Sequence, residues 1–215
     1  MAGAEDRIAE IKPHPRRRHF YLLVLDDQQA LCVHEDVIVA LGLGAGRYLT
    51  ADLREQIEYR SRLVDAEQIA LRQLKTRARS RAELAGTLRG RGFEDAVIEE
   101  VLSKLENIRL VDDRELARDM TESLLRRRPM GRRGLHYRLT QRGLGDDVAD
   151  AAVAQALEGS DELQHATDLL RRKLPGWEGL PAVKRRTRAY QLLARRGFEP
   201  DTIADALNTV LPDEP

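Results

Sequence analysis

The sequence is poor in cysteine and in aromatic residues, and these shortages exclude several classes of protein fold. Its 215 residues include one cysteine, Cys32, which excludes an internal disulfide and a cysteine-based metal cage. Because Cys32 lies in a short apolar run, we expect it to be a buried structural residue. Aromatic residues make up 4% of the chain and charged residues 33%, a balance that disfavours a large β structure and is typical of helical bundles or repeats.

Long apolar runs and the common catalytic patterns are also missing. No stretch of about 18 apolar residues is present, so we expect no transmembrane helix and no membrane partner. Residues 1–18 are mostly polar and lack the apolar core of a secretory signal, which predicts a cytoplasmic location. We find no phosphate-binding glycine loop, no metal-ligand spacing among the histidines and no Ser/His/Asp arrangement. The sequence therefore predicts a protein that is not an enzyme and uses no metal or cofactor.

The first 65 residues differ in character from the rest of the chain. Residues 1–18 carry two prolines, little apolar material and three consecutive arginines, so we predict a flexible basic arm. Residues 19–25 and 30–34 are rich in β formers and flank a polar turn, a pattern that predicts a β-hairpin. Residues 35–41 then predict a short helix that ends at Gly42.

Three later segments share one layout, which indicates tandem repeats. Each contains an Arg-Gly-apolar triplet, and the glycines lie 51 and 54 positions apart. A helix commonly ends on a glycine in the left-handed conformation, after which an apolar residue packs back on the helix in a Schellman motif. This motif would bring Leu88, Leu139 and Leu193 against the apolar residue of each triplet. The triplets are Arg91-Gly92-Phe93, Arg142-Gly143-Leu144 and Arg196-Gly197-Phe198.

Helix-start signals complete each repeat. Ser80 with Glu83 has the spacing of a capping box, and Asp112 with Glu115 is a similar acidic cap. Leading helices are expected at residues 66–77, 114–128 and 161–174, which gives nine repeat helices after about two earlier ones. The predicted fold is mainly α: an elongated, curved array of three tandem three-helix repeats, preceded by a small N-terminal β-hairpin with short helices. The predicted domains are 1–18 (flexible basic arm), 19–65 (N-terminal hairpin and helices), and 66–110, 111–158 and 159–215 (the three repeats).

The formal net charge is zero, but the charges alternate in step with the repeats. Basic segments carry net charges of +6 (residues 70–92), +7 (126–142) and +8 (171–196), and acidic segments carry −6 (94–122), −7 (143–170) and −5 (199–215). The second helix of each repeat is therefore basic and the third is acidic. A protein with a basic side and an acidic side suits the groove of a polyanionic or mixed-charge filament.

We assign a candidate DNA- or filament-binding surface to the basic segments. Solvated helix faces are the plain alternative, and helix dipoles account for Arg91, Arg142 and Arg196 near helix ends. Dipoles do not account for Arg126-Arg127-Arg128 followed at once by Arg132-Arg133 with no acidic residue between them. They also do not account for Lys184-Arg185-Arg186 with Arg188, which opens a helix. The candidate residues are Arg77, Arg79, Arg81, Arg126, Arg127, Arg128, Arg132, Arg133, Arg138, Lys184, Arg185, Arg186 and Arg188.

The motifs of the first repeat and of the joint that follows it are similar to those of RecX regulatory proteins. The resemblance covers roughly residues 66 to 211 and is carried by Ser80-Arg81-Ala82-Glu83-Leu84, Leu88, Arg91-Gly92-Phe93, Leu110-Val111-Asp112-Asp113, Gly131, Arg132-Arg133, Leu139, Gly143 and Val148. It implies a regulator that binds the RecA–single-stranded DNA filament and inhibits its growth, ATP hydrolysis and strand exchange. It also implies DNA binding, single-stranded or double-stranded, and we expect a monomer. The joint departs from the family, which often has an aromatic residue beside the Asp pair, where this chain has Val111 and Leu116.

Two other functions stay open at this point. Paired helices joined by a glycine turn resemble helix-turn-helix modules, so a DNA-binding transcriptional regulator is the alternative. Gln141 and Gln191 are the only amides associated with the basic second helices, which favours phosphate contact over base reading. A helical scaffold that binds another protein is the third interpretation.

Overall fold

The computed structural model describes residues 6–212, and within them it contains ten α-helices, one 3₁₀-helix and four β-strands. None of the helices described is both long enough and apolar enough to cross a membrane. The chain divides into two compact units. The first unit comprises the described residues up to Arg77 together with Leu84–Leu110, and the second comprises Ala78–Glu83 together with the described residues from Val111 onward.

The first unit begins with a four-stranded antiparallel sheet of order β3-β2-β1-β4. The predicted hairpin is confirmed, because β2 pairs with β3 in a register that places Phe20 opposite His34 and Val24 opposite Ala30. The sheet is therefore larger than the hairpin by two strands. The strands are β1 (Asp6–Pro13), β2 (Phe20–Leu25), β3 (Ala30–His34) and β4 (Tyr48–Leu49).

The prediction of a flexible arm is wrong for residues 6–13, which form β1 between β2 and β4. β1 pairs with both neighbours, and Ile8 is completely buried. The polar composition of β1 concealed the strand, because hydrogen bonds along both of its edges stabilise it in addition to apolar contacts. Arg16, Arg17 and Arg18 lie in the connection from β1 to β2, and residues 1–5 of the predicted arm lie outside the described residues.

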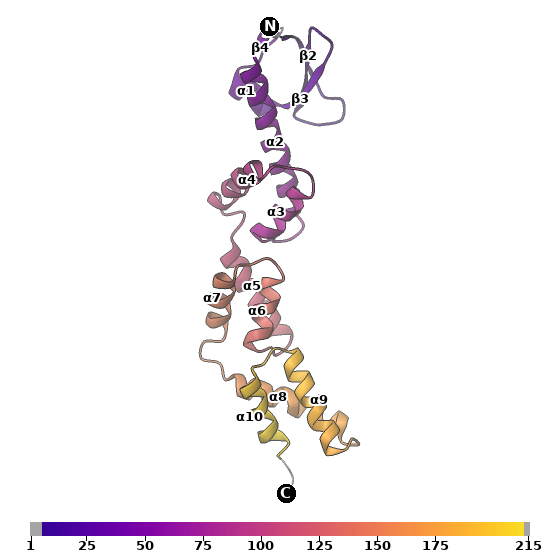
Figure 1. Ribbon diagram of the computed structural model, residues 1–215, viewed down its shortest axis with the longest axis vertical. Helices are drawn as coiled ribbons and strands as arrows, with labels where there is room; N and C mark the ends of the chain where they lie inside the picture. The colour runs from indigo at the N-terminus through magenta and orange to yellow at the C-terminus, as the bar shows by residue number, and fades with distance from the viewer. Residues whose placement is uncertain (1–5, 213–215) are drawn as a thin grey trace. The chain divides into compact units, whose positions relative to one another are not determined.

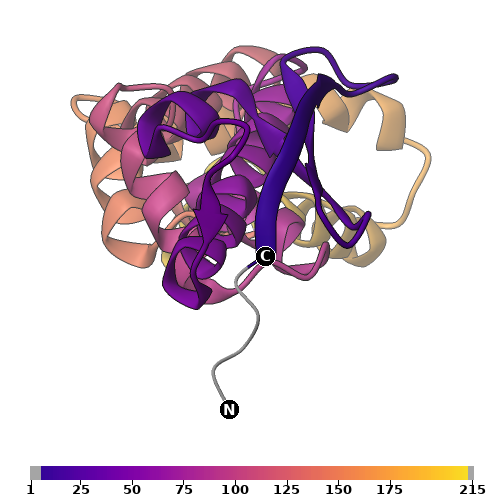
Figure 2. The same ribbon diagram turned by 90° about the horizontal axis from the view of Figure 1, so that it is seen from above.

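Two helices pack on the sheet (Figures 1 and 2). α1 (Glu35–Leu41) ends at Gly42, whose φ of 58° confirms the predicted left-handed cap. α2 (Ala51–Leu74) begins after Thr50, whose hydroxyl accepts a hydrogen bond from the Leu53 amide at 3.2 Å. The helices and strands share one apolar core, formed by Ile8, Leu23, Leu25, Val33, Val37, Leu43, Leu49, Leu53 and Ile57.

α2 also corrects a predicted boundary. We predicted a separate leading helix at residues 66–77 after an earlier helix, but one helix of 24 residues runs through both. No glycine or proline occurs between residues 51 and 74, so nothing interrupts the helix. α2 therefore contacts the sheet near its start and serves as the first helix of the first repeat near its end (Figure 1).

Three three-helix repeats follow the sheet, as predicted. In each repeat the first helix packs against the third: α2 against α4, α5 against α7, and α8 against α10. The mainly helical fold with a small N-terminal sheet is thus confirmed. The remaining helices are α3 (Arg81–Arg89), α4 (Asp95–Asn107), α5 (Asp113–Arg127), α6 (Arg132–Thr140), α7 (Asp146–Ala156), α8 (Glu162–Lys173), the 3₁₀-helix η1 (Leu174–Trp177), α9 (Ala182–Arg195) and α10 (Pro200–Val210).

Each repeat turns at its Arg-Gly-apolar triplet in the predicted Schellman geometry. The three glycines have φ values of 85°, 73° and 70° in chain order. In every turn the amide of the apolar residue donates to the carbonyl of a fully buried leucine, which anchors the second helix in the core of its repeat. These bonds run from Phe93 to Leu88 at 3.3 Å, from Leu144 to Leu139 at 3.3 Å and from Phe198 to Leu193 at 3.2 Å.

The predicted helix starts are confirmed as well. The Ser80 hydroxyl accepts from the Glu83 amide, and the Glu83 carboxylate accepts from the Ser80 amide, each at 3.1 Å. Asp112 caps α5 by accepting from the amides of Arg114 and Glu115, both at 3.0 Å. Both caps satisfy amides that have no partner within the helix.

The start of α3 is held by the turn of the second repeat. The Ser80 hydroxyl donates to the carbonyl of Arg142 at 2.5 Å. The Arg142 guanidinium donates to both carboxylate oxygens of Glu83 at 3.0 Å, and the Arg81 amide donates to Asp113 Oδ1 at 2.9 Å. Side chains therefore make most of this first joint.

The start of α6 is held in the same way by the turn of the third repeat. The Gly131 amide donates to the Arg196 carbonyl at 3.0 Å, and the Gly134 amide donates to the Gly197 carbonyl at 3.2 Å. A Cβ atom on Gly134 would lie 2.3 Å from the Arg196 carbonyl oxygen, and one on Gly197 would lie 2.0 Å from the Gly134 nitrogen. The Arg132 amide also donates to Glu162 Oε1 at 2.9 Å, as the Arg81 amide does to Asp113 at the first joint. The contact with the turn itself is therefore made mainly by backbone at this second joint.

Candidate nucleic-acid interface

Six exposed arginines lie along the end of α5, the connection to α6 and α6 itself. We call them the central arginine cluster: Arg126, Arg127, Arg128, Arg132, Arg133 and Arg138. Within residues 6–212, none of their guanidinium groups forms a hydrogen bond or an ion pair with another residue. Positive groups without acidic partners leave this surface able to bind a polyanion.

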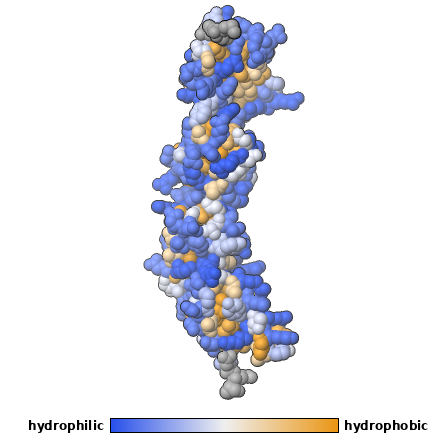
Figure 3. Space-filling model, viewed as in Figure 1, coloured by the Kyte–Doolittle hydropathy of each residue, from blue (hydrophilic) through white to orange (hydrophobic). Residues whose placement is uncertain are grey.

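Helix dipoles explain only part of this cluster. Arg126 and Arg127 lie in the last turn of α5, where the dipole favours cations. Arg132 and Arg133 open α6, where the dipole disfavours them, and the first turn of α6 itself contains no acidic residue. The carboxylate of Glu162, from the start of α8, accepts a hydrogen bond from the Arg132 amide at 2.9 Å and offsets part of this cost. Placing two arginines there lowers helix stability, which favours a binding role for them. On the face of the second unit drawn in Figure 3, hydrophilic residues cover most of the surface.

Two tyrosines and two arginines line a hollow of about 380 Å³ where α6 meets α9 and α10. Tyr137 is 59% exposed and Tyr190 is 50% exposed, while Arg133 and Arg195 complete the rim. We call this feature the tyrosine hollow. Aromatic rings can stack on unpaired bases, and guanidinium groups bind phosphate oxygens, so the hollow could hold one nucleotide of a single strand.

Neither tyrosine was among the predicted site residues, although a signal for one was present. Leu135 and Leu139 mark the buried face of α6, so Tyr137, midway between them, points to the exposed face. Tyr137 also follows Arg133 by four residues, which places both side chains on one side of the helix. An aromatic residue on the exposed face of a basic helix is thus a detectable mark of a stacking site.

The candidate residues of the first repeat are less available to bind a partner than those of the central arginine cluster. Arg77 is exposed, whereas Arg79 and Arg81 are half-buried. All three interact with other residues of the chain. Their contribution to binding a partner is therefore expected to be smaller.

The candidate residues of the third repeat divide into two groups. Lys184 and Arg188 are exposed on α9, while Arg185 is half-buried. Arg186 donates to the carbonyl of Leu211 at 2.7 Å and to Asn208 Oδ1 at 2.8 Å. Arg186 therefore fastens the end of α10 to α9, and Lys184 and Arg188 are the residues left for a partner.

Two further arginines serve the joints between repeats. Arg142 is engaged by Glu83, as described above, and Arg196 Nη1 donates to the carbonyl of Pro129 at 3.1 Å. Burial, followed by the nearby charge of Arg128, lowers the pKa of Arg196. A guanidinium group keeps its charge under such conditions, so Arg196 adds to the positive field around the α5–α6 connection.

The chemistry of this interface comes from arginine and tyrosine. Among residues 6–212, no group of three or more His, Cys, Asp or Glu side chains is arranged to hold a metal ion. Cys32 lies in the first unit, where it is half-buried rather than buried as predicted, with its Sγ 3.7 Å from Arg17 Nη1. The arrangement in the second unit is suited to binding an anionic strand.

Comparison with known proteins identifies the repeats. Family models for the first, second and third three-helix domains of RecX match residues 66–105, 112–153 and 160–207. A relative named Regulatory protein RecX from Chlorobaculum tepidum is 36% identical over 145 residues, which cover 67% of this chain and 88% of the relative. A relative of the same name from Mycolicibacterium smegmatis is 35% identical over 159 residues, which cover 72% of this chain and 84% of the relative.

A solved structure agrees with the fold. The crystal structure of a regulatory protein RecX superposes with a TM-score of 0.73 at 21% identity, covering 97% of this chain and 100% of that chain. The shared fold, the three matched domains and the identity to the named relatives lead to one conclusion. The chain belongs to the RecX family of regulatory proteins.

Proposed function

We propose that this protein binds the RecA–single-stranded DNA filament and inhibits its growth, ATP hydrolysis and strand exchange without catalysing a reaction itself. Membership of the RecX family of regulatory proteins supports the choice of partner. The observation that carries the proposal is the central arginine cluster, whose six guanidinium groups have no side-chain partner within residues 6–212. Such a surface binds phosphates of a nucleic acid with little regard to sequence.

The tyrosine hollow supports single-stranded DNA as the component that is contacted. Bases of a single strand are free to stack on Tyr137 and Tyr190, whereas bases within a duplex are already stacked on one another. The third helices add acidic surface, as with the exposed Asp146, Asp147 and Asp150 of α7. Basic and acidic surfaces on one chain suit a partner that contains both DNA and protein.

The helix-turn-helix alternative is less well supported. In that motif the N-terminal residues of the second helix enter the major groove. Here the amides of Gly131 and Gly134 at the start of α6 are bonded to the turn of the third repeat. The start of α3 is engaged in the same manner through Ser80. Because these contacts cover one side of the start of α3 and of α6, neither helix can enter the major groove of DNA end-on without obstruction.

The direct test is RecA-catalysed ATP hydrolysis on single-stranded DNA, titrated with this protein. We expect inhibition at stoichiometric levels, and we expect the variant Arg132→Glu/Arg133→Glu to need at least about tenfold more protein for half inhibition, because it reverses two phosphate contacts. The dipole at a helix start favours acidic residues, whereas the nearby Glu162 carboxylate disfavours them, so circular dichroism of the variant is compared with that of the unmodified protein before the titration.

The matched control is Arg114→Glu/Arg118→Glu, which makes the same charge change at exposed positions of α5 in the same unit. This variant should inhibit nearly as well as the unmodified protein. Absence of inhibition by the unmodified protein would contradict the proposed function. Equal losses in the two variants would show that net charge matters and the position of the arginines does not.

A further inference from the structure

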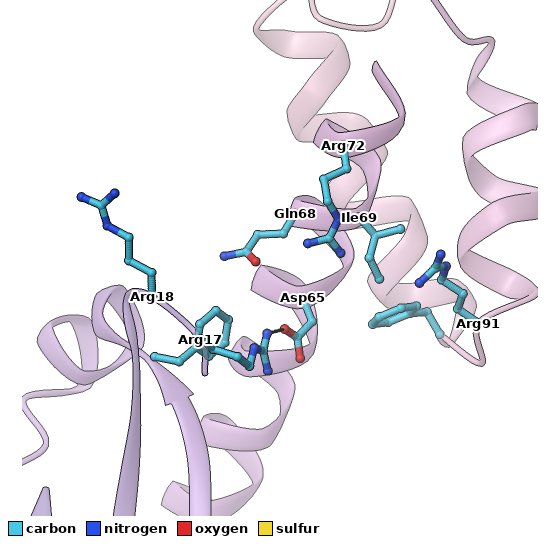
Figure 4. A pocket seen from close by; sticks show the side chains of 9 residues that line it. Arg17, Arg18, Asp65, Gln68, Ile69, Arg72 and Arg91 are labelled. Carbon is cyan, nitrogen blue, oxygen red and sulfur yellow. Dashed lines mark hydrogen bonds and ion pairs between the residues drawn. The ribbon is translucent and has the colours of Figure 1, made fainter. Parts of the chain in front are cut away.

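A cleft in the first unit brings together arginines from three segments that are distant in sequence. Arg18 comes from the β1–β2 connection, Arg72 from α2 and Arg91 from the turn between α3 and α4. The cleft has a volume of about 690 Å³. Figure 4 shows Arg18 at one rim and Arg72 and Arg91 at the other, with Asp65 between them. None of the three belongs to the surface predicted from the sequence.

The cleft carries uncompensated positive charge. Asp65 is the only carboxylate among the described residues that line it, and Asp65 already forms an ion pair with Arg17. The residues Arg18, Arg72 and Arg91 are exposed, and their guanidinium groups form no hydrogen bond or ion pair within the described part of the chain. Three like charges around one space repel each other, and an anion bound between them would relieve that repulsion.

Arg17 makes the cleft a preformed structure. Its guanidinium carbon lies 3.4 Å from the centre of the Phe20 ring, and its Nη1 lies 3.7 Å from Cys32 Sγ. The same side chain is paired with Asp65 of α2 (Figure 4). These contacts tie the β1–β2 connection to α2 and so fix the backbone that carries Arg18. A preformed site loses little conformational entropy when a ligand binds.

We propose that this cleft binds the phosphate backbone of single-stranded DNA, with Phe93 offering its ring to a base. Guanidinium groups bind phosphate oxygens through paired hydrogen bonds, and the half-buried Phe93 lines the cleft next to Arg91 in the chain. A phenyl ring stacks on an unpaired base, whereas an acidic peptide gains no such contact. The proposal rests on the proposed function for the identity of the strand, and it adds a second contact, in the first unit, to those of the second unit.

The test measures binding of a fluorescein-labelled oligothymidylate to the full chain, without RecA, over a series of salt concentrations. The variant Arg18→Ala/Arg72→Ala/Arg91→Ala should bind at least about tenfold more weakly at low salt. Its plot of log affinity against log salt should lose about two units of slope, since each phosphate contact on a single strand contributes about 0.7.

The matched control is Arg60→Ala compared with Arg72→Ala. Both arginines are exposed on α2, but Arg60 lies outside the cleft, beside acidic residues such as Glu58. Arg60→Ala should leave affinity and salt slope unchanged, while Arg72→Ala should lower both. Unchanged binding by the triple variant, or an equal loss for Arg60→Ala, would overturn the proposal.

A local reporter distinguishes the cleft from the second unit. The chain has one tryptophan, Trp177, so Trp177→Phe combined with Phe93→Trp places the sole indole in the cleft. Oligothymidylate should quench this fluorescence, and should still do so when Arg132→Glu/Arg133→Glu is added. Quenching of the reporter chain, combined with no inhibition of RecA by the unmodified protein, would count for the cleft and against the proposed function. Equal displacement of the oligonucleotide by polyglutamate at matched ionic strength would instead identify a site for an acidic protein segment.

Discussion

The two joints of the second unit make the same contact by different means. In both, the Arg-Gly turn of one repeat holds the start of the second helix of the repeat before it. At the first joint the side chains of Ser80 and Glu83 reach the turn, whereas at the second joint the backbones of Gly134 and Gly197 touch directly. What recurs between repeats is therefore the position of the turn, while the residues that contact it differ.

This difference implies that loss of side-chain atoms affects the first joint more than the second, while a Cβ atom on the turn glycine affects both: on Gly143 it would lie 2.7 Å from the Ala82 Cβ, and on Gly197 it would meet backbone. A joint made by side chains is weakened when atoms are removed, because buried polar groups lose their partners. A joint made by backbone contact is weakened when atoms are added, because there is no room for them. Removal of side-chain atoms should therefore weaken the first joint in particular, and an added Cβ should be most costly at Gly197, where it would meet backbone at 2.0 Å.

The largest effect is expected for Gly197→Ala at the second joint. The new Cβ would lie 2.0 Å from the Gly134 nitrogen, and the residue has a φ of 70°, which disfavours a side chain. Overpacking and left-handed strain together should lower the free energy of unfolding by about 4 kcal/mol. Urea denaturation followed by circular dichroism measures this change.

Two other glycines provide the controls for that prediction. Gly159 has a φ of 69° but open space around its Cβ position, so Gly159→Ala should cost only the backbone strain of about 1 to 2 kcal/mol. Gly179 has neither constraint, and Gly179→Ala should be nearly neutral. If Gly197→Ala costs no more than Gly159→Ala, the close backbone approach at the second joint is refuted.

An intermediate effect is expected for Glu83→Ala at the first joint. This change leaves the Arg142 guanidinium, whose side chain is 29% exposed, without its carboxylate, and it removes the acceptor for the Ser80 amide. We expect a loss of about 2 kcal/mol, moderated by the remaining solvent access. A double-mutant cycle with Arg142→Ala should give a coupling of about 1 kcal/mol.

The control for the first joint is Glu122→Ala, which removes an exposed carboxylate from α5. It should change stability by less than about 0.5 kcal/mol, as is usual for exposed positions. A coupling near zero between Glu83 and Arg142 would mean that the ion pair does not hold the joint.

The smallest effect is expected for Ser80→Ala. The hydroxyl both caps α3 and donates to Arg142, so its removal should cost about 1 kcal/mol or slightly more. Asp161→Ala removes a cap from α8, where Asp161 Oδ1 accepts from Gln164 at 3.0 Å with no contact to a joint. Thermal denaturation should rank Ser80→Ala as the more destabilising change, and the reverse order would argue that the joint adds nothing to the cap.

The repeats could be predicted from sequence more fully than the sheet. A Schellman turn depends on residues five positions apart, such as Leu139 and Leu144, and a capping box on residues three apart, so both leave a local signal. β1 left no such signal, because it is stabilised by pairing with β2 and β4, which lie further along the chain. The boundary expected before residue 66 was wrong for a different reason: no glycine or proline interrupts residues 51–74, so the sequence itself allowed one continuous helix.

The candidate interface was predictable in its charge but not in its availability. The positions of the basic residues follow from the sequence, and the central arginine cluster is exposed as expected. Arg186 is instead engaged by Leu211 and Asn208, which lie more than twenty residues away. The tyrosine hollow likewise depends on α6 and α9 meeting, because Tyr137 and Tyr190 belong to different repeats.

Residues that are neighbours along the chain decide where each repeat helix ends and which helices are basic, because caps and helix faces are formed within a turn or two. Segments that meet only after folding decide which arginines remain available to a partner and whether a joint can accept a Cβ atom. Gly92 and Gly197 illustrate the division. Both end a helix in the left-handed conformation, yet the Cβ position is open at Gly92 and blocked by Gly134 at Gly197.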